Sequence, residues 1–120
     1  MNYATHNTDQ KSYEQIIKTG KFKPSNSGWV GPGLYAYNGK GGKEGKGIYK
    51  VYFLLDGLKL YEGGLPEGTT QKEWNKIRSK NGRIVDRFLF NLGYDGEIDS
   101  SIVRIYTYSV DKIKPIAKLI

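Results

Sequence analysis

The stretch IYKVYFLL, residues 48–55, is the strongest strand signal in the sequence and the starting point for the fold. β-Branched and aromatic residues fill it, as is typical of a strand that packs against a core. Asp56 and Gly57 follow, and such a pair favours a tight turn into a second apolar stretch, residues 58–61. The sequence therefore predicts a β-hairpin formed by residues 48–55 and 58–61.

Shorter strand patterns lie on both sides of this hairpin. Residues 3–6, 34–37 and 97–98 are short strand candidates. Residues 101–108 alternate Ile102, Arg104, Tyr106 and Tyr108 with Val103, Ile105 and Thr107, which predicts a longer strand near the end of the chain.

Three segments carry helix signals. Thr8 or Asp9 can cap a helix that runs to Lys18 and stops at Gly20. The capping box TQKE, residues 70–73, opens a helix to about Ser79, which Asn81-Gly82 ends. Helical spacing of apolar residues predicts a further helix through Ile84, Val85, Phe88, Leu89 and Leu92. Strands and helices do not alternate as in doubly wound proteins, so the expected class is α+β.

Length and composition restrict the class of protein. A chain of 120 residues with 38% hydrophobic and 26% charged residues fits a single globular domain spanning residues 1–120. No apolar run approaches the roughly 20 residues of a membrane span, and the N-terminus lacks a signal pattern. We therefore expect a cytoplasmic protein with no membrane partner. With no cysteine and one histidine, we expect no metal site.

The balance of charge points to an anionic partner. The net charge is +7, which favours nucleic acid, nucleotides or an acidic protein. Residues 38–47 hold five glycines and three lysines, Lys40, Lys43 and Lys46, and Lys50 follows. Such a run is either a solvated loop or a site that attracts a pyrophosphate or a nucleic-acid backbone.

Two N-terminal motifs could contact a ligand. His6 and Thr8 lie between the first strand and the first helix, where Thr8 can also serve as a simple helix cap. Gly31 and Gly33 precede Tyr35, and glycines let a ligand approach the backbone closely, although they equally suit a tight turn.

Three carboxylates surround a turn near the end of the chain. Asp95, Glu97 and Asp99 are unusual in so basic a sequence. They either form a turn with solvated side chains or supply a carboxylate that stabilises a developing cation.

In their order along the chain, these motifs resemble the ADP-ribosyltransferase fold. His6-Asn7-Thr8 and Gly31-x-Gly33-Leu34-Tyr35 resemble the branch named for a His-Tyr-Glu (or Asp) triad. This branch includes the poly-ADP-ribose polymerases, diphtheria-type toxins and many small bacterial and phage effectors. Residues 47–54, 93–97 and 108–115 resemble its core and last strands.

The resemblance implies a split pair of mainly antiparallel sheets with NAD, the substrate, in the cleft between them. It implies that His6 forms a hydrogen bond to a ribose hydroxyl of NAD and that Thr8 supports the same part of the cleft. It also implies that Tyr35 stacks near the nicotinamide, with Tyr37 as a second wall of the cleft. Glu97 is the favoured catalytic carboxylate and Asp99 the alternative, because strand alternation places both on one side. Arg104 departs from the family pattern, since it stands at a later position where a Glu is expected.

The resemblance implies a mono-ADP-ribosyltransferase that modifies a macromolecular acceptor, protein or nucleic acid, with an acidic surface. Small members of the branch are often bacterial or phage effectors, which act in the cytosol of a host. Two alternatives stay open. One is an NAD glycohydrolase, in which water is the acceptor. The other is a non-enzymatic binding module that holds nucleic acid or an acidic protein through lysines and tyrosines.

Overall fold

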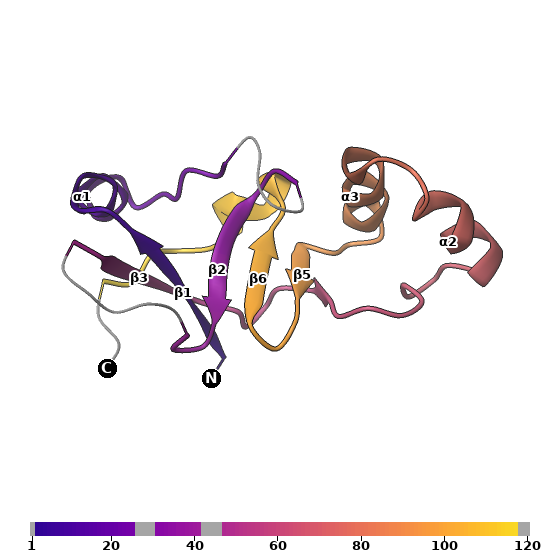
Figure 1. The fold of residues 1–120 in the computed structure, drawn as a ribbon, viewed down its shortest axis with the longest axis horizontal. Coiled ribbons are helices and arrows are strands. Elements are labelled where there is room, and N and C mark those ends of the chain that lie inside the picture. The colour runs from indigo at the N-terminus through magenta and orange to yellow at the C-terminus, as the bar shows by residue number, and fades with distance from the viewer. Residues whose placement is uncertain (1, 26–30, 42–46, 118–120) are drawn as a thin grey trace.

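The computed structural model describes residues 2–25, 31–41 and 47–117, and Figure 1 shows their arrangement. Along the chain the elements are β1 (Tyr3–Thr8), α1 (Gln10–Thr19), β2 (Leu34–Asn38), β3 (Tyr49–Leu54), β4 (Leu60–Tyr61), α2 (Gln71–Ile77), α3 (Gly82–Asn91), β5 (Gly96–Ile98), β6 (Ile102–Ile105) and the 3₁₀ helix η1 (Thr107–Lys112).

The strands form one mixed sheet in the order β3-β1-β2-β6-β5-β4. Neighbouring strands are antiparallel except for β4 and β5, which are parallel. Helix α1 lies at the β3–β1 end of the sheet, and α2 and α3 lie together beyond β5 (Figure 1). The molecule is accordingly elongated, with extents of 48 × 28 × 24 Å. The mixed helices and strands confirm the α+β class.

The expected hairpin across Asp56 and Gly57 is wrong. Gly57 does turn the chain, with φ at 84°, and the Leu58 N–H donates to the Leu55 carbonyl at 3.1 Å. The chain then leaves β3, which lies at one edge of the sheet, and forms β4 at the opposite edge. β3 pairs with β1 because β1 offers six residues of ladder, whereas β4 has only two residues to offer.

Three further expectations differ from the structure. The first strand, expected over residues 3–6, runs to Thr8, so His6 and Thr8 lie within the strand and not between it and the helix. The split into two sheets is not observed among the described residues, because β2 and β6 are hydrogen-bonded along four residue pairs and join both halves. The strand expected over residues 101–108 ends at Ile105, because Tyr106 turns the chain into η1 and its carbonyl accepts from the Ser109 N–H at 2.8 Å.

The expected helices are confirmed, with changes at their boundaries: α2 ends at Ile77, where about Ser79 was expected, and α3 begins at Gly82. Asp9 caps α1 by accepting from the Ser12 N–H, and Gly20 ends it in the left-handed conformation. Thr70 caps α2 in the predicted capping box. Asn81 was expected to end a helix, but its side chain accepts from the Ile84 N–H and begins α3 instead.

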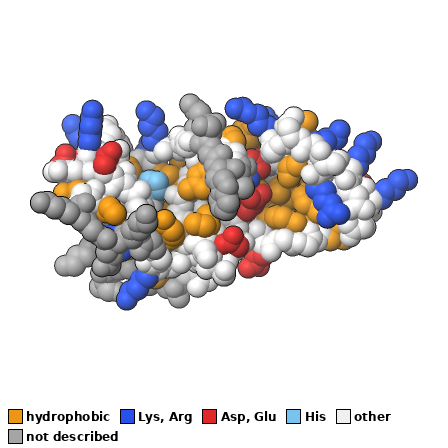
Figure 2. All heavy atoms as spheres, viewed as in Figure 1, with side chains coloured by type: hydrophobic (Ala, Val, Ile, Leu, Met, Phe, Trp, Pro, Cys, Tyr) orange, Lys and Arg blue, Asp and Glu red, His pale blue; other side chains and the backbone are white. Residues whose placement is uncertain are grey.

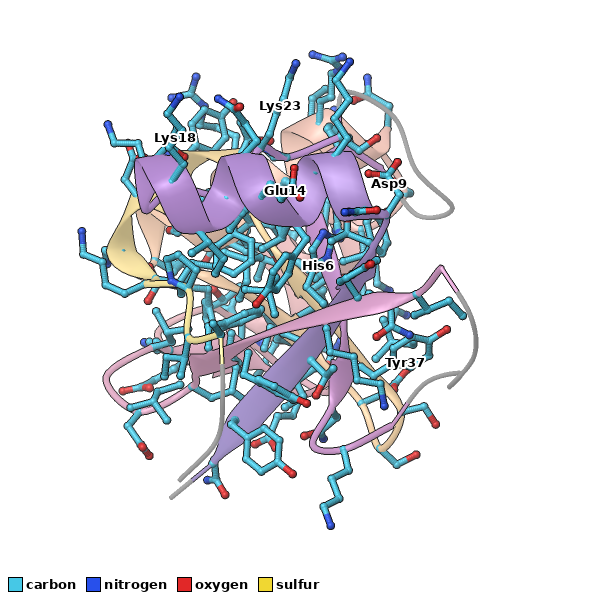
Figure 3. The ribbon with its side chains drawn as sticks, turned by 90° about the vertical axis from the view of Figure 1, so that its left-hand side faces the viewer. His6, Asp9, Glu14, Lys18, Lys23 and Tyr37 are labelled. Carbon is cyan, nitrogen blue, oxygen red and sulfur yellow. The ribbon has the colours of Figure 1, made fainter. Side chains whose placement is uncertain are left out.

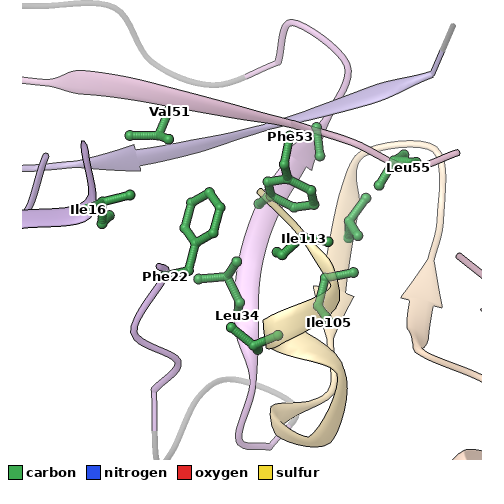
Figure 4. Packing of buried hydrophobic residues seen from close by; sticks show 12 residues of the cluster. Ile16, Phe22, Leu34, Val51, Phe53, Leu55, Ile105 and Ile113 are labelled. Carbon is green, nitrogen blue, oxygen red and sulfur yellow. The ribbon is translucent and has the colours of Figure 1, made fainter. Parts of the chain in front are cut away.

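The main hydrophobic core lies between the sheet and the segments that cover it. Phe22, which follows α1, packs edge-on against Phe53 of β3 with ring centres 5.3 Å apart. Figure 4 shows Ile16 of α1 and Ile113 beside η1 closing the same cluster. A second cluster, built on Trp74, Leu89, Tyr94 and Tyr106, joins α2 and α3 to the β5 end of the sheet.

Candidate functional site

A row of polar and aromatic side chains crosses one face of the sheet. Tyr35 of β2 is paired with Arg104 of β6, and Arg104 is paired with Glu97 of β5. Glu97 in turn lies beside Tyr61 of β4. Directly paired residues share a face of a sheet. The ladder therefore brings Tyr35 and Glu97 to the same side, with Arg104 between them.

These side chains line a pocket of about 290 Å³, which we call the tyrosine–carboxylate pocket. Its lining consists of Tyr35, Tyr61, Glu62, Gly63, Glu97, Ile98, Asp99, Ile102 and Arg104. The volume lies just below the roughly 300–1,000 Å³ typical of ligand sites. Two expected catalytic residues, Tyr35 and Glu97, thus meet in one hollow, and Asp99 is at its rim.

Arg104 is the buried charge at the centre of this row, with a side chain only 4% exposed. Its two terminal nitrogens each donate to one oxygen of the Asp86 carboxylate at 2.8 Å, a bidentate pair. Its Nη2 also lies 3.1 Å from Glu97 Oε1. Burial opposes the charge of Arg104, but the hydrogen bonds and charges of Asp86 and Glu97 outweigh it and raise the pKa.

The charges of this group do not cancel. Arg104 supplies one positive charge, whereas Asp86 and Glu97 supply two negative charges, and Glu62 and Asp99 add carboxylates at the pocket. Figure 2 shows a group of acidic side chains at the middle of the molecule, with further acidic side chains at its left-hand end. The pocket therefore favours a cationic group in a protein whose net charge is +7.

Two tyrosines near Glu97, Tyr61 and Tyr106, have a raised pKa and are therefore neutral at pH 7. Burial, followed by the charge of Glu97, raises the pKa of Tyr61. Burial and the charges of Glu97 and Asp86 raise the pKa of Tyr106, whose hydroxyl donates to Glu97 Oε1 at 3.2 Å. Glu97 is therefore held in place by both Arg104 and Tyr106.

The other two acidic residues of this segment support the fold. Asp99 is exposed, and its Oδ1 accepts from the Ser101 and Ile102 N–H groups at 2.7 Å, closing the β5–β6 turn. These bonds lower its pKa. Asp95 is buried and accepts from Lys59, Ser109 and Lys112. Burial opposes its charge, but these bonds prevail and lower its pKa. Asp99 also lines the pocket, but its Oδ1 is held by the turn, whereas Glu97 is held beside Arg104 and Tyr106.

His6 and Thr8 lie on the opposite face of the sheet. Thr5 is paired with Tyr37, and side chains alternate along a strand, so His6 and Thr8 face away from Tyr35 and Tyr37. Figure 3 shows His6 beneath α1 and Tyr37 on the other side of the strands. His6 and Thr8 line a separate groove of about 850 Å³ beside α1 and residues 21–24. The described residues therefore do not bring His6 and Glu97 into one pocket.

His6 is nevertheless linked to the Tyr35 strand through the backbone. Its Nδ1 lies 2.7 Å from the Tyr35 carbonyl oxygen, so Nδ1 carries the proton and donates. The ring packs edge-on against Phe22 at 5.7 Å. Burial lowers the pKa of His6, and the bond to Tyr35 offsets this only in part. The neutral imidazole thus fixes the position of β2 next to Tyr35.

The two glycines before Tyr35 make room for the protein's own groups. A Cβ on Gly33 would lie 2.5 Å from the Ile105 carbonyl oxygen, and one on Gly31 would lie 3.0 Å from Arg104 Nη1. The Tyr35 hydroxyl donates to the Gly31 carbonyl at 2.5 Å. Both glycines therefore allow β2 and Arg104 to approach closely, and they hold the Tyr35 ring in place.

The remaining candidates lie away from the pocket or outside the described residues. Tyr37 lines a different hollow at the end of β1, together with Asn7, Thr8 and Ile48. Lys40 is exposed after β2, whereas Lys43 and Lys46 lie outside the described residues.

Asp86 and Tyr61 are the site residues that sequence reasoning missed. Asp86 falls among the apolar positions of α3, and Arg104 falls among those of β6. A charged residue inside an apolar stripe requires a buried partner, so these two positions together carried a signal for the ion pair.

Within the described ranges, no group of three or more histidine or carboxylate side chains is placed to hold a metal ion. None of the described helices has the length and apolar character needed to cross a membrane. Comparisons with protein-family models, with curated proteins and with solved structures find no match to this chain.

Proposed function

We propose that this chain cleaves the nicotinamide–ribose bond of NAD in the tyrosine–carboxylate pocket and transfers ADP-ribose to a macromolecular acceptor. The observation that carries the proposal is the convergence of Tyr35 and Glu97, with Tyr61, in one hollow with excess negative charge. The nicotinamide ring of NAD is cationic, and tyrosine faces and carboxylates both attract a cation, the former by about 0.5–2 kcal/mol.

The same charge favours the transition state. The bond between the nicotinamide nitrogen and ribose C1′ breaks, its electron pair leaves with neutral nicotinamide, and positive charge develops on the ribose as in glycoside hydrolysis. The acceptor nucleophile then bonds to C1′ and releases its proton to solvent. A fixed carboxylate near C1′ stabilises this cation more than the ground state, which raises the rate. Glu97 is assigned this role because Asp99 Oδ1 already accepts the N–H groups of the β5–β6 turn.

In this proposal His6 has a positioning role. It contacts the Tyr35 carbonyl and faces the α1 groove, so it holds the strand that carries Tyr35. Because the pocket, at about 290 Å³, is too small to enclose a whole dinucleotide, the proposal places only the nicotinamide end in it, and the adenylate end extends outside.

Release of nicotinamide from NAD by the purified protein tests the proposal, with and without a cell lysate that supplies acceptors. A second assay follows label from the adenylate of NAD into macromolecules. Glu97→Gln keeps the shape and removes the charge, so nicotinamide release should fall by about two orders of magnitude. Glu14→Gln, an exposed carboxylate on α1, is the matched control and should keep full activity.

The outcomes separate the alternatives. Nicotinamide release without labelled macromolecules would identify water as the acceptor, the glycohydrolase alternative. Absence of nicotinamide release under all conditions, or full activity of Glu97→Gln, would overturn the proposed chemistry at this pocket.

A further inference from the structure

The α2–α3 lobe, which we define as residues 71–91, carries a concentrated positive charge. Six of the chain's 19 basic residues lie in this segment, against two acidic ones. Of these two, Asp86 is buried and forms an ion pair with Arg104, and Glu73 accepts a hydrogen bond from the Thr70 hydroxyl. The six basic side chains are all exposed: Lys72, Lys76, Arg78, Lys80, Arg83 and Arg87. Figure 2 shows basic side chains spread over this end of the molecule.

No carboxylate within the described part of the chain forms an ion pair with any of these six side chains. A fold gains little stability from unpaired surface cations, and like charges close together repel one another. The lobe therefore suits a polyanion, which would replace this repulsion with attraction.

An exposed aromatic ring borders the lobe. Tyr108 of η1 is 52% exposed, packs against Phe90 with ring centres 5.1 Å apart, and lies 4.8 Å from the Arg87 guanidinium carbon. Arg83, one turn before Arg87 on α3, lines a hollow of about 150 Å³ together with Tyr108. Two guanidinium groups and the exposed part of one ring thus share one surface, with Arg87 over the ring and Phe90 tilted against it.

We propose that the α2–α3 lobe and Tyr108 bind a single-stranded nucleic acid. Lysine and arginine neutralise backbone phosphates, while a base can stack on the open part of an aromatic ring or on a guanidinium plane. Each nucleotide of a single strand presents both a phosphate and a flat base, so one strand can contact the guanidinium groups and the exposed part of the Tyr108 ring together. The adjacent ring and guanidinium groups therefore favour a nucleic-acid strand. This inference does not depend on the NAD chemistry proposed above.

Fluorescence anisotropy tests the proposal with a labelled single strand of about 15 nucleotides, near the upper end of known site sizes. Affinity is measured between about 50 and 200 mM salt, because each phosphate contact contributes about −0.7 to the slope of log K against log salt. Replacing Arg83 and Arg87 together by glutamine should weaken binding about tenfold or more and reduce the slope by about 1.4.

A matched variant separates this surface from bulk charge. The double variant Lys11→Gln, Lys18→Gln also removes two positive charges, but from α1 at the opposite end of the molecule. It should change the affinity by less than about twofold. Tyr108→Leu removes the ring without changing charge, so affinity should fall about tenfold with the salt slope unchanged. Circular dichroism of each variant confirms that the fold is retained.

Three results would overturn the proposal. Equal losses in the two double variants would show that net charge alone attracts the strand. An unchanged affinity in Tyr108→Leu would remove the stacking contact. Binding of polyglutamate at this surface, with no binding of the oligonucleotide, would identify an acidic protein as the partner.

Discussion

Arg104 is the residue on which the geometry of the candidate site depends. Its guanidinium joins Asp86 of α3 to Glu97 of β5, so it fixes the carboxylate of the pocket and ties a helix to the sheet. Removing one member of a buried ion pair leaves the other charge without compensation in a poor solvent. The stability of the protein and the position of Glu97 are therefore coupled through one side chain.

Arg104→Ala should lower the free energy of unfolding by about 3–5 kcal/mol, the usual cost of breaking a buried pair. The midpoint of urea unfolding measures this loss. Arg78→Ala, which removes an exposed arginine, should change the stability by less than about 0.5 kcal/mol. A similar small loss in both variants would contradict the view that the Arg104–Asp86 pair supports the fold.

The single histidine gives the protein a predictable response to acid. Burial lowers the pKa of folded His6 below its ordinary value of 6.5, so the unfolded chain binds more protons in the window between the two values. Stability is therefore fully present above about pH 6.5 and decreases as the pH falls through that window. Urea unfolding at several pH values between 7.5 and 5 should show this decrease.

The control for this prediction is His6→Gln, whose amide can still donate to the Tyr35 carbonyl. Carboxylates with lowered pKa values, Asp9, Asp95 and Asp99, lose their contribution only in more acidic solution, since their ordinary pKa is 3.8. The decrease between pH 6.5 and 5 should therefore be absent in the variant. An unchanged pH dependence would assign the effect to another group.

At the scale of elements, the close approach of β2 and β6 decides how Tyr35 meets Arg104. Gly33 has φ at 144°, and an added Cβ would lie 2.5 Å from the Ile105 carbonyl oxygen. Gly57 also has a positive φ, 84°, but nothing lies within 4 Å of the place its Cβ would take. An alanine at position 57 therefore meets backbone strain alone, whereas an alanine at position 33 meets both strain and a steric clash.

Gly33→Ala should therefore cost more stability than Gly57→Ala. Strain alone costs about 1–3 kcal/mol at either site, and Gly33→Ala must in addition push β2 away from β6. Thermal unfolding of both variants measures the difference. If Gly57→Ala proved equally or more destabilising, the tight contact between the two strands would not be important for stability.

Local patterns predicted the elements much better than their pairing. The caps at Asp9 and Thr70 and the apolar spacing of α3 depend on nearby residues, and the structure confirms those helices. The partner of β3 depends on which distant strand offers the longest ladder, and the turn at Gly57 carries no information about that choice. Short-range signals therefore suggested a hairpin that the whole sheet excludes.

The same distinction explains the candidate site. Sequence order suggested that His6, Tyr35 and Glu97 meet, but whether strand residues meet depends on register and on which face each side chain takes. The register places Tyr35 and Glu97 on one face, through Arg104, and His6 on the other. A resemblance in motif order carries no information about this alternation.

At the scale of the whole molecule, two hydrophobic clusters divide the structure. One lies between the sheet and α1, and the other joins α2 and α3 to the β5 end of the sheet. Helix α2 has seven residues, of which only Trp74 is buried. Helices shorter than about 12 residues are marginal without packing, so α2 depends mainly on Trp74, with half-buried Ile77 packed against the same cluster.

Trp74→Ala should release α2 while leaving the main sheet folded. Removing a buried tryptophan costs about 3–5 kcal/mol, more than so short a helix can recover from its own hydrogen bonds. Hydrogen exchange resolved by residue should then show α2 amides losing protection, while β1 amides, which pair with both β2 and β3, keep theirs. Phe22→Ala, in the main cluster, should instead reduce protection in β1 as well. Equal loss of protection in α2 and β1 after Trp74→Ala would mean that the two clusters unfold as one unit. The α2–α3 lobe could then not unfold without the sheet.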